Sequence, residues 1–127
     1  MDSSTPRGVL LAEDQTEIRE LLSIIFEMEG FRVFQGVDGQ AALEILQQNK
    51  EDIILLVTDL GLPRLGGVEL IQKARALKPS LRIMGTSGYG RVNVREEVLA
   101  AGGDDFFAKP FVAIELVQKA KSLLGLT

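Results

Sequence analysis

The stretch Ile53–Asp59, which reads IILLVTD, decides the fold. Six consecutive aliphatic or β-branched residues end in a carboxylate, and no charge interrupts the run. A strand that is apolar on both faces is typical of the centre of a parallel sheet, because helices cover such a sheet on both sides. The stretch therefore predicts a buried central strand with Asp59 at its carboxyl end.

Strand and helix patterns alternate on both sides of this stretch. Further strands are predicted at residues 9–12, 31–34, 81–84 and 105–108, and Gly85 is expected to weaken the fourth of the five. Apolar residues spaced three and four apart predict a helix after each strand. Five such units predict an α/β fold with a doubly wound, five-stranded parallel sheet. The flavodoxin-like strand order 2-1-3-4-5 is adopted as the common arrangement for a chain of this kind.

Helix boundaries are marked by capping residues. Asp38 is a predicted N-cap for the second helix. Asn93, with Glu96 three residues later, resembles a capping box at the start of the fourth helix. Gly102 is predicted to end that helix.

The composition removes several classes of chemistry. The chain has no Cys and no His, which excludes disulfides, thiolate nucleophiles, imidazole zinc sites and Ser-His-Asp catalysis. Its net charge of −4 argues against direct binding of nucleic acid or of an anionic membrane, since both need a surplus of Lys and Arg. Carboxylate, hydroxyl, amine and backbone groups remain for chemistry.

The 127 residues are expected to form one domain. We expect residues 1–7 to be a disordered lead-in and residues 8–127 to be the folded domain. The first eight residues lack the apolar core of a signal peptide, and no apolar run reaches membrane-spanning length. Together with the absence of Cys, this favours a cytoplasmic location.

Reactive side chains follow four of the five predicted strands. In an open α/β sheet, ligands bind beyond the carboxyl ends of the strands. The residues at that edge are Glu13 and Asp14 after the first strand, Asp59 at the end of the third, Thr86 and Ser87 after the fourth, and Lys109 after the fifth. The second strand leads to Gln35 and Gly36, which are chemically quiet.

Three carboxylates at one edge predict a divalent metal site. Glu13, Asp14 and Asp59 would repel one another unless a cation lay among them. Mg²⁺ prefers such oxygen ligands. A carboxylate can also attack phosphorus, and this transfer depends mainly on positioning and on neutralising charge. We therefore expect Asp59 to accept a phosphoryl group beside Mg²⁺, with Lys109 and a hydroxyl from the fourth strand bound to the phosphoryl oxygens.

Each of these residues also has a plain structural interpretation. Asp14 could cap the first helix, and Asp59 could form the turn that follows its strand. Glu13, Ser87 and Lys109 could be ordinary surface or loop groups. The functional hypothesis rests on their common place at one edge of the sheet.

These motifs, in this order, resemble the receiver (response-regulator) domain of two-component signalling, from about residue 8 to residue 124. The matching pieces are VLLAED at 9–14, LVTDL at 56–60 with Pro63 and Gly67, TSGY at 86–89 and FFAKPF at 106–111. The resemblance implies that Asp59 is the phosphoacceptor. It also implies that Glu13, Asp14 and the backbone carbonyl of Gly61 join Asp59 in binding Mg²⁺.

The same resemblance implies how the domain would switch. Ser87 would move towards the phosphoryl group and Phe106 would change rotamer with it. Lys109 would contact the phosphoryl oxygens, and its peptide bond to Pro110 would be cis. The face formed by residues 93–124 would be the output surface.

The resemblance also implies partners. The donor would be a histidine kinase or a histidine phosphotransfer protein, and the receiver could pair with a second receiver. The chain would be a signalling phosphoacceptor that catalyses only its own phosphoryl transfer and dephosphorylation, rather than an enzyme with a separate substrate. The run SGYG at 87–90 favours the receiver of a hybrid histidine kinase over a stand-alone regulator or one cut from its output domain.

Two other classes of function remain as alternatives. A degenerate receiver would act as an unphosphorylated protein-interaction module. An enzyme on a similar sheet fits less well, because a flavodoxin would place a hydroxyl- and glycine-rich loop where Glu13 and Asp14 stand. A dehalogenase-type phosphohydrolase would need a second Asp where Gly61 stands.

Overall fold

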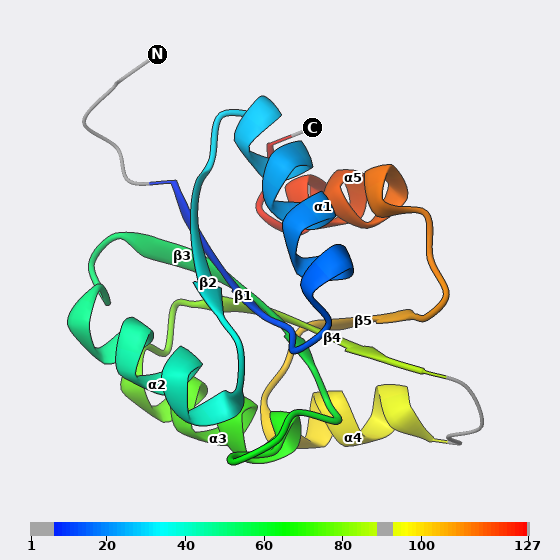
Figure 1. Ribbon diagram of the computed structural model, residues 1–127. Coiled ribbons are helices and arrows are strands. Elements are labelled where there is room, and N and C mark those ends of the chain that lie inside the picture. Colours follow the sequence, from blue (N-terminus) through cyan, green and yellow to red (C-terminus); the bar gives the residue numbers. More distant parts are fainter. Residues whose placement is uncertain (1–6, 89–92, 127) are drawn as a thin grey trace.

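The computed structural model describes residues 7–88 and 93–126, in which strands and helices alternate (Figure 1). The elements are β1 Gly8–Ala12, α1 Thr16–Met28, β2 Arg32–Gly36, α2 Gly39–Gln48, β3 Ile53–Asp59, α3 Gly67–Leu77, β4 Arg82–Ser87, α4 Val94–Ala101, β5 Asp105–Ala108 and α5 Ala113–Leu123. The strands form one parallel sheet in the order β2-β1-β3-β4-β5. The predicted fold class and strand order are confirmed.

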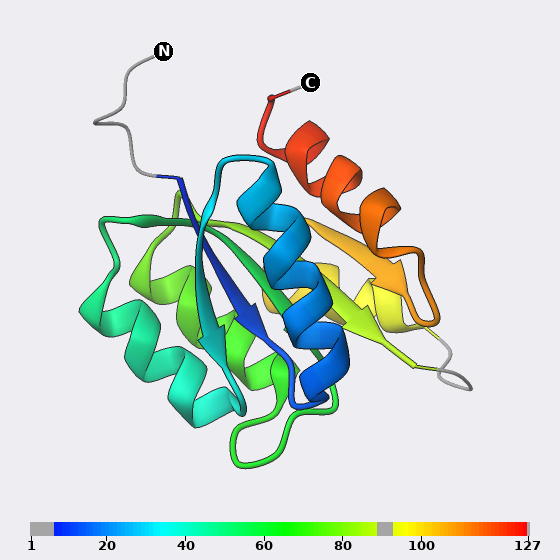
Figure 2. The same cartoon turned by 45° about the horizontal axis from the view of Figure 1, so that its top comes forward.

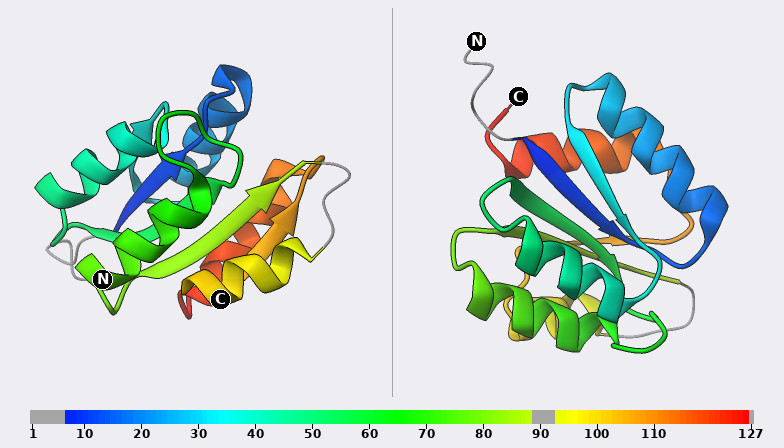
Figure 3. Two further views of the ribbon diagram at one scale, coloured as in Figure 1. Left: turned by 90° about the horizontal axis from the view of Figure 1, so that it is seen from below. Right: turned by 60° about the vertical axis from the view of Figure 1, so that its left-hand side comes forward.

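The sheet lies between two layers of helices. Helices α1 and α5 cover one face, and α2, α3 and α4 cover the other (Figures 2 and 3). Alternate residues of β3 supply both cores: Leu56 packs on the side of α2, α3 and α4, whereas Leu55 and Val57 pack on the side of α1 and α5. The apolar run that decided the fold is therefore the strand shared by both cores.

Strand β4 is longer than the sequence predicted. It passes through Gly85 and ends at Ser87, so the expected weakening at Gly85 is wrong. A Cβ atom on Gly85 would lie 2.6 Å from Cγ2 of Val98, which belongs to α4. The glycine therefore allows α4 to approach the strand closely, and the strand delivers Ser87 to the carboxyl edge of the sheet.

Two of the three predicted helix signals hold. The Asp38 side chain accepts a hydrogen bond from the N–H of Ala41 at 2.7 Å, which confirms the N-cap of α2. Gly102 ends α4 with a φ of 110°, as predicted. The capping box at Asn93 is wrong, because this residue is left-handed, with a φ of 60°, and its side chain makes no cap hydrogen bond.

Some sequence-based predictions fall outside the described residues. Residues 1–6 of the expected lead-in do so, and so does Tyr89 of the motif at 86–89. Across the part of the chain that the structure describes, no helix is both long and apolar enough to cross a membrane.

Candidate functional site

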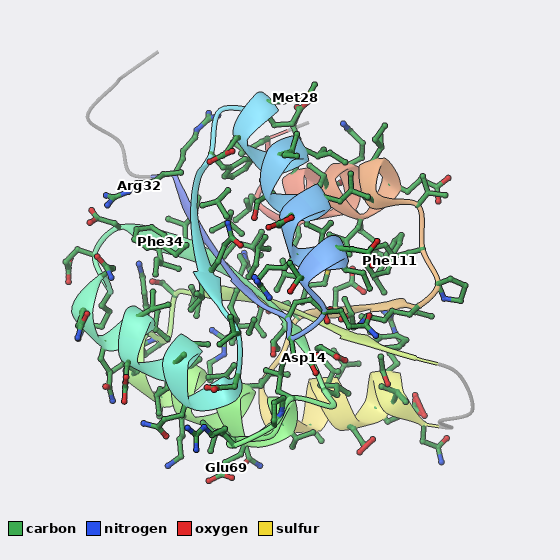
Figure 4. All side chains as sticks on the ribbon, viewed as in Figure 1. Asp14, Met28, Arg32, Phe34, Glu69 and Phe111 are labelled. Carbon is green, nitrogen blue, oxygen red and sulfur yellow. The ribbon has the colours of Figure 1, made fainter. Side chains whose placement is uncertain are left out.

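The carboxyl edge of the sheet brings the three predicted acids together. Glu13 and Asp14 leave the end of β1, and Asp59 is the last residue of β3. Each offers a carboxylate oxygen, and these oxygens all lie within 4.8 Å of one another. Figure 4 shows Asp14 in the turn between β1 and α1. The three differ in exposure, because Glu13 is buried, Asp59 is half-buried and Asp14 is exposed.

Lys109 joins the cluster from the end of β5. Its Nζ lies 2.8 Å from Oε1 of Glu13 and 3.3 Å from Oδ2 of Asp59. Its backbone N–H donates to the carbonyl of Ser87 at 2.8 Å, which ties the end of β5 to the end of β4. The bond between Lys109 and Pro110 is cis, as predicted. Lys109 is thus a partly buried cation rather than an ordinary surface lysine.

Burial and pairing act on both charges of this ion pair. Burial raises the pKa of the Glu13 carboxyl above its ordinary value, and hydrogen bonds from Lys109 and from the N–H of Gln15 offset this only in part. Burial lowers the pKa of the Lys109 ammonium group. Its hydrogen bond to Glu13 and the nearby charges of Asp59 and Glu13 outweigh that effect, so its pKa lies above the ordinary value.

The loop after β3 holds Asp59 in place. The N–H of Gly61 donates to Oδ1 of Asp59 at 3.3 Å, so Asp59 does shape the turn, as its structural interpretation required. The N–H of Leu60 donates to the carbonyl of Thr86 at 2.9 Å, which fixes the loop to β4. Gly61 itself is exposed beside the acids. The Asp59 side chain therefore both shapes the turn and belongs to the acidic cluster.

The helix-cap interpretation of Asp14 is wrong. The N-cap of α1 is Gln15, and no side-chain hydrogen bond caps this helix. The exposed carboxylate of Asp14 thus faces the same space as the other two acids without serving α1.

Ser87 and Phe106 lie on the neighbouring strands β4 and β5. Ser87 is the buried last residue of β4, one position beyond Thr86, which pairs with Asp59. Phe106 pairs with Gly85 across β4 and β5. Its ring is partly buried and packs against the core on the side of α2, α3 and α4.

Sequence reasoning missed two residues behind the acids. Arg19, on α1, donates from Nη1 to the backbone carbonyl of Glu13 at 2.9 Å. Its Nε donates to Oε1 of Gln35 at 3.0 Å. The end of β2 was expected to be chemically quiet. Instead, Gln35 orients a guanidinium group that contacts the turn formed by Glu13 and Asp14, which we call the acidic turn. The only sequence signal for this was an arginine soon after the acidic pair.

The residues present fit a divalent cation. Three carboxylates against one ammonium group leave two negative charges in a small, partly buried space. A hard divalent cation offsets that charge, and Mg²⁺ accepts this set of oxygen ligands. The side chains of Glu13, Asp14 and Asp59 would hold it.

Comparison with known proteins gives this arrangement a family. The model of the family described as "Response regulator receiver domain" matches residues 9–121. The chain belongs to the response regulator receiver family. This receiver is 31% identical to sporulation initiation phosphotransferase F of Bacillus subtilis over 118 residues, which are 93% of this chain and 94% of that protein.

Two further matches differ in how much of the other protein the receiver covers. It is 36% identical to transcriptional regulatory protein PrrA of Mycobacterium tuberculosis over 95% of this chain but only 51% of that protein. A CheY-like receiver domain protein of Methanospirillum hungatei superimposes with a TM-score of 0.86 at 28% identity, over 94% of each chain. The receiver thus spans about half the length of one curated relative and almost all of another.

The family assignment settles the class of function. The chain is a receiver domain of the response regulators in two-component systems, and such domains are signalling phosphoacceptors that interact with histidine kinases or phosphotransferases. They typically bind Mg²⁺, with which the acidic cluster is consistent. The alternative of an unphosphorylated interaction module gains no support.

Proposed function

We propose that Asp59 accepts the phosphoryl group. One observation carries this assignment: the carboxylate of Asp59 lies 3.3 Å from an ammonium group and within 4.8 Å of two further carboxylates that would hold a divalent cation. Glu13 and Asp14 are themselves less suited to accept it. The first is buried in an ion pair with Lys109, and the second is exposed to solvent.

The transfer is a displacement at phosphorus. An oxygen of Asp59 attacks the phosphorus of a phosphohistidine on the donor, the P–N bond breaks, and the imidazole leaves with that electron pair. Lys109 turns from Asp59 to an oxygen of the arriving phosphoryl group. The carboxylates of Glu13, Asp14 and Asp59, with the backbone carbonyl of Gly61, would hold Mg²⁺, which would supply positive charge to neutralise the phosphoryl oxygens.

The phosphoryl group then acts on the neighbouring strands. Ser87 is buried at the end of β4, beside the strand that carries Asp59, and its hydroxyl donates to a phosphoryl oxygen. Movement of the β4 end frees space for Phe106, two strands away from Asp59. This shifts an existing equilibrium of the face formed by α4, β5 and α5.

A groove beside the site is the surface for the donor. It has a volume of about 370 Å³ and lies between α1 and the segment after β5, lined by Ile18, Leu21, Phe111 and Lys109 among others. Because Lys109 lines both the groove and the acidic site, a donor seated here presents its phosphohistidine to Asp59. Leu21→Glu should slow transfer from a phosphorylated histidine phosphotransfer protein and leave acetyl phosphate as effective as before.

The remaining proposals concern the location and the partners of the receiver. We propose a cytoplasmic domain that does not itself bind nucleic acid or membrane, in line with its net charge of −4. Pairing of two receivers and membership of a hybrid histidine kinase stay predictions. The acceptor role makes the chain its own substrate, so it turns over no separate compound.

Intact-protein mass spectrometry tests the acceptor. Incubation with acetyl phosphate and Mg²⁺ should add the mass of one phosphoryl group to the wild type and to Asp52→Asn, a control on a half-exposed acid at the opposite edge of the sheet. Asp59→Asn should gain nothing. An adduct on Asp59→Asn, or none on the wild type with either acetyl phosphate or a phosphorylated kinase, would overturn the proposal.

A further inference from the structure

Arg19 reaches back from α1 to the turn after β1 that carries Glu13 and Asp14. Its Nη1 donates to the carbonyl oxygen of Glu13 at 2.9 Å, and its Nε donates to Gln35 at 3.0 Å. A guanidinium group is planar, with its N–H donors in a fixed fork, so two bonds in different directions fix its orientation as well as its position. The backbone of Arg19 is itself held in the first turns of α1, since its N–H donates to the carbonyl of Gln15.

Arg19 binds the backbone of the acidic turn. The N–H of Glu13 donates to the carbonyl of Gly36 on β2 at 3.1 Å, and the carbonyl of Glu13 accepts from Arg19. Both backbone polar groups of Glu13, its N–H and its carbonyl, are therefore fixed. The peptide group that leads into Asp14 is fixed with them. Asp14 needs this support because it is exposed and its side chain does not cap α1.

We infer that Arg19, oriented by Gln35, is a positioning residue for divalent-cation binding. It fixes the turn from which Glu13 and Asp14 project, so that their carboxylates converge with that of Asp59. It does not bind the cation, and its hydrogen bond to the acidic turn is to the backbone carbonyl of Glu13. This inference rests on the proposed metal site, and it adds a part of β2 to a site otherwise built from the other four strands.

The sign of the effect separates positioning from simple electrostatics. Arg19 carries a positive charge close to the acidic cluster, so loss of that charge alone would strengthen the binding of a cation. Loss of positioning would weaken it. Residues that orient metal ligands typically change metal affinity by about 10- to 100-fold when they are replaced, and we expect Arg19→Gln to weaken Mn²⁺ binding by about tenfold.

The test is a titration with Mn²⁺, followed by the electron paramagnetic resonance signal of the free ion. Arg32→Gln is the charge-matched control, because Arg32 is exposed and lies at the opposite end of the strands from Asp14 (Figure 4). It should bind Mn²⁺ as the wild type does. Gln35→Ala should weaken binding less than Arg19→Gln, and Arg19→Lys should fall between Arg19→Gln and the wild type.

A second readout separates positioning from general damage to the fold. In acetyl phosphate reactions, Arg19→Gln should need about tenfold more Mg²⁺ for half-maximal phosphorylation but reach the wild-type rate at saturation. A lower rate that Mg²⁺ does not restore would contradict the inference. If Arg19→Gln does not fold, Arg19→Lys and Gln35→Ala decide in its place.

The outcomes distinguish this inference from the proposal on which it rests. Equal or tighter Mn²⁺ binding by Arg19→Gln would overturn the positioning role, while phosphorylation of Asp59 would stand. A wild-type protein that binds no Mn²⁺ and is not phosphorylated would overturn the metal site itself.

Discussion

Lys109 competes with any cation for the acids of the site. Its ammonium group lies 2.8 Å from a Glu13 oxygen and 3.3 Å from an Asp59 oxygen, and all three side chains are largely buried. We predict that Lys109→Met binds Mn²⁺ about tenfold more tightly, a change of about 1.4 kcal/mol, because two paired oxygens become free for the metal. It should also be phosphorylated more slowly, since the phosphoryl oxygens lose their ammonium partner.

Mn²⁺ titration and the rate of the mass increase measure these two effects separately. Lys119→Met is the matched control, because Lys119 is more exposed and pairs with Asp105 outside the acidic cluster. It should change neither quantity. Weaker Mn²⁺ binding by Lys109→Met would show that the ammonium group supports the metal rather than competing with it.

The residues that could be predicted at the site are those that a strand delivers directly. Glu13, Asp59 and Lys109 each stand at or just after a strand end, so the order of the strands was enough to place them together. Arg19 and Gln35 escaped notice because their hydrogen bond joins residues 16 apart, on α1 and β2. They meet at the acidic turn only because α1 packs on the paired strands β1 and β2.

At the scale of the elements, Arg75 ties α3 to the turn between α4 and β5. From α3 it donates to the carbonyls of Gly102, Pro79 and Leu81 and to the carboxylate of Asp104. Arg75→Met would leave these acceptors without that partner in a partly buried position. We predict a loss of about 2–4 kcal/mol in the free energy of unfolding, measured by urea denaturation and circular dichroism.

Arg82 provides an internal comparison for this prediction. It lies 3.6 Å from the same Asp104 carboxylate, but more than half of its side chain is exposed. Arg82→Met should therefore cost less than about 1 kcal/mol, as exposed ion pairs do. Equal losses of unfolding free energy for Arg75→Met and Arg82→Met would mean that the hydrogen bonds from Arg75 to backbone carbonyls add nothing to stability.

Element types were more predictable than element ends, for a physical reason. The apolar periodicity of a strand or helix lies within the element, whereas its end depends on what packs there. Gly85 was expected to weaken β4, yet Val98 of α4 requires a glycine at that point of the strand. Asn93 resembled a cap by residue type, but its left-handed backbone does not present the side chain to α4.

At the scale of the molecule, β5 links the site to both helical layers. Phe106 packs against the core on the side of α2, α3 and α4, and Phe107 packs against the core on the side of α1 and α5. Lys109 follows the same strand into the acidic site. A change at the carboxyl edge can therefore reach α4 through one face of β5 and α5 through the other.

Hydrogen exchange of backbone amides tests whether the whole molecule responds in this way. Beryllofluoride with Mg²⁺ takes the place of a phosphoryl group on an aspartate. We predict that it changes exchange in α4, β5 and α5, because Ser87 and Phe106 shift the equilibrium of that face. Helix α2 packs on β1 and β2, at the other side of the sheet from β5, and should keep its exchange rates.

Asp59→Asn separates the switch from simple binding of ions to the protein. This variant should show no change in exchange on addition of beryllofluoride and Mg²⁺, because it lacks the carboxylate that binds the beryllium. A uniform slowing across all helices of the wild type would indicate general stabilisation by a bound ligand. An unchanged α4, β5 and α5 in a wild type that demonstrably binds beryllofluoride would place the output surface elsewhere, since the site would then be filled without moving this face.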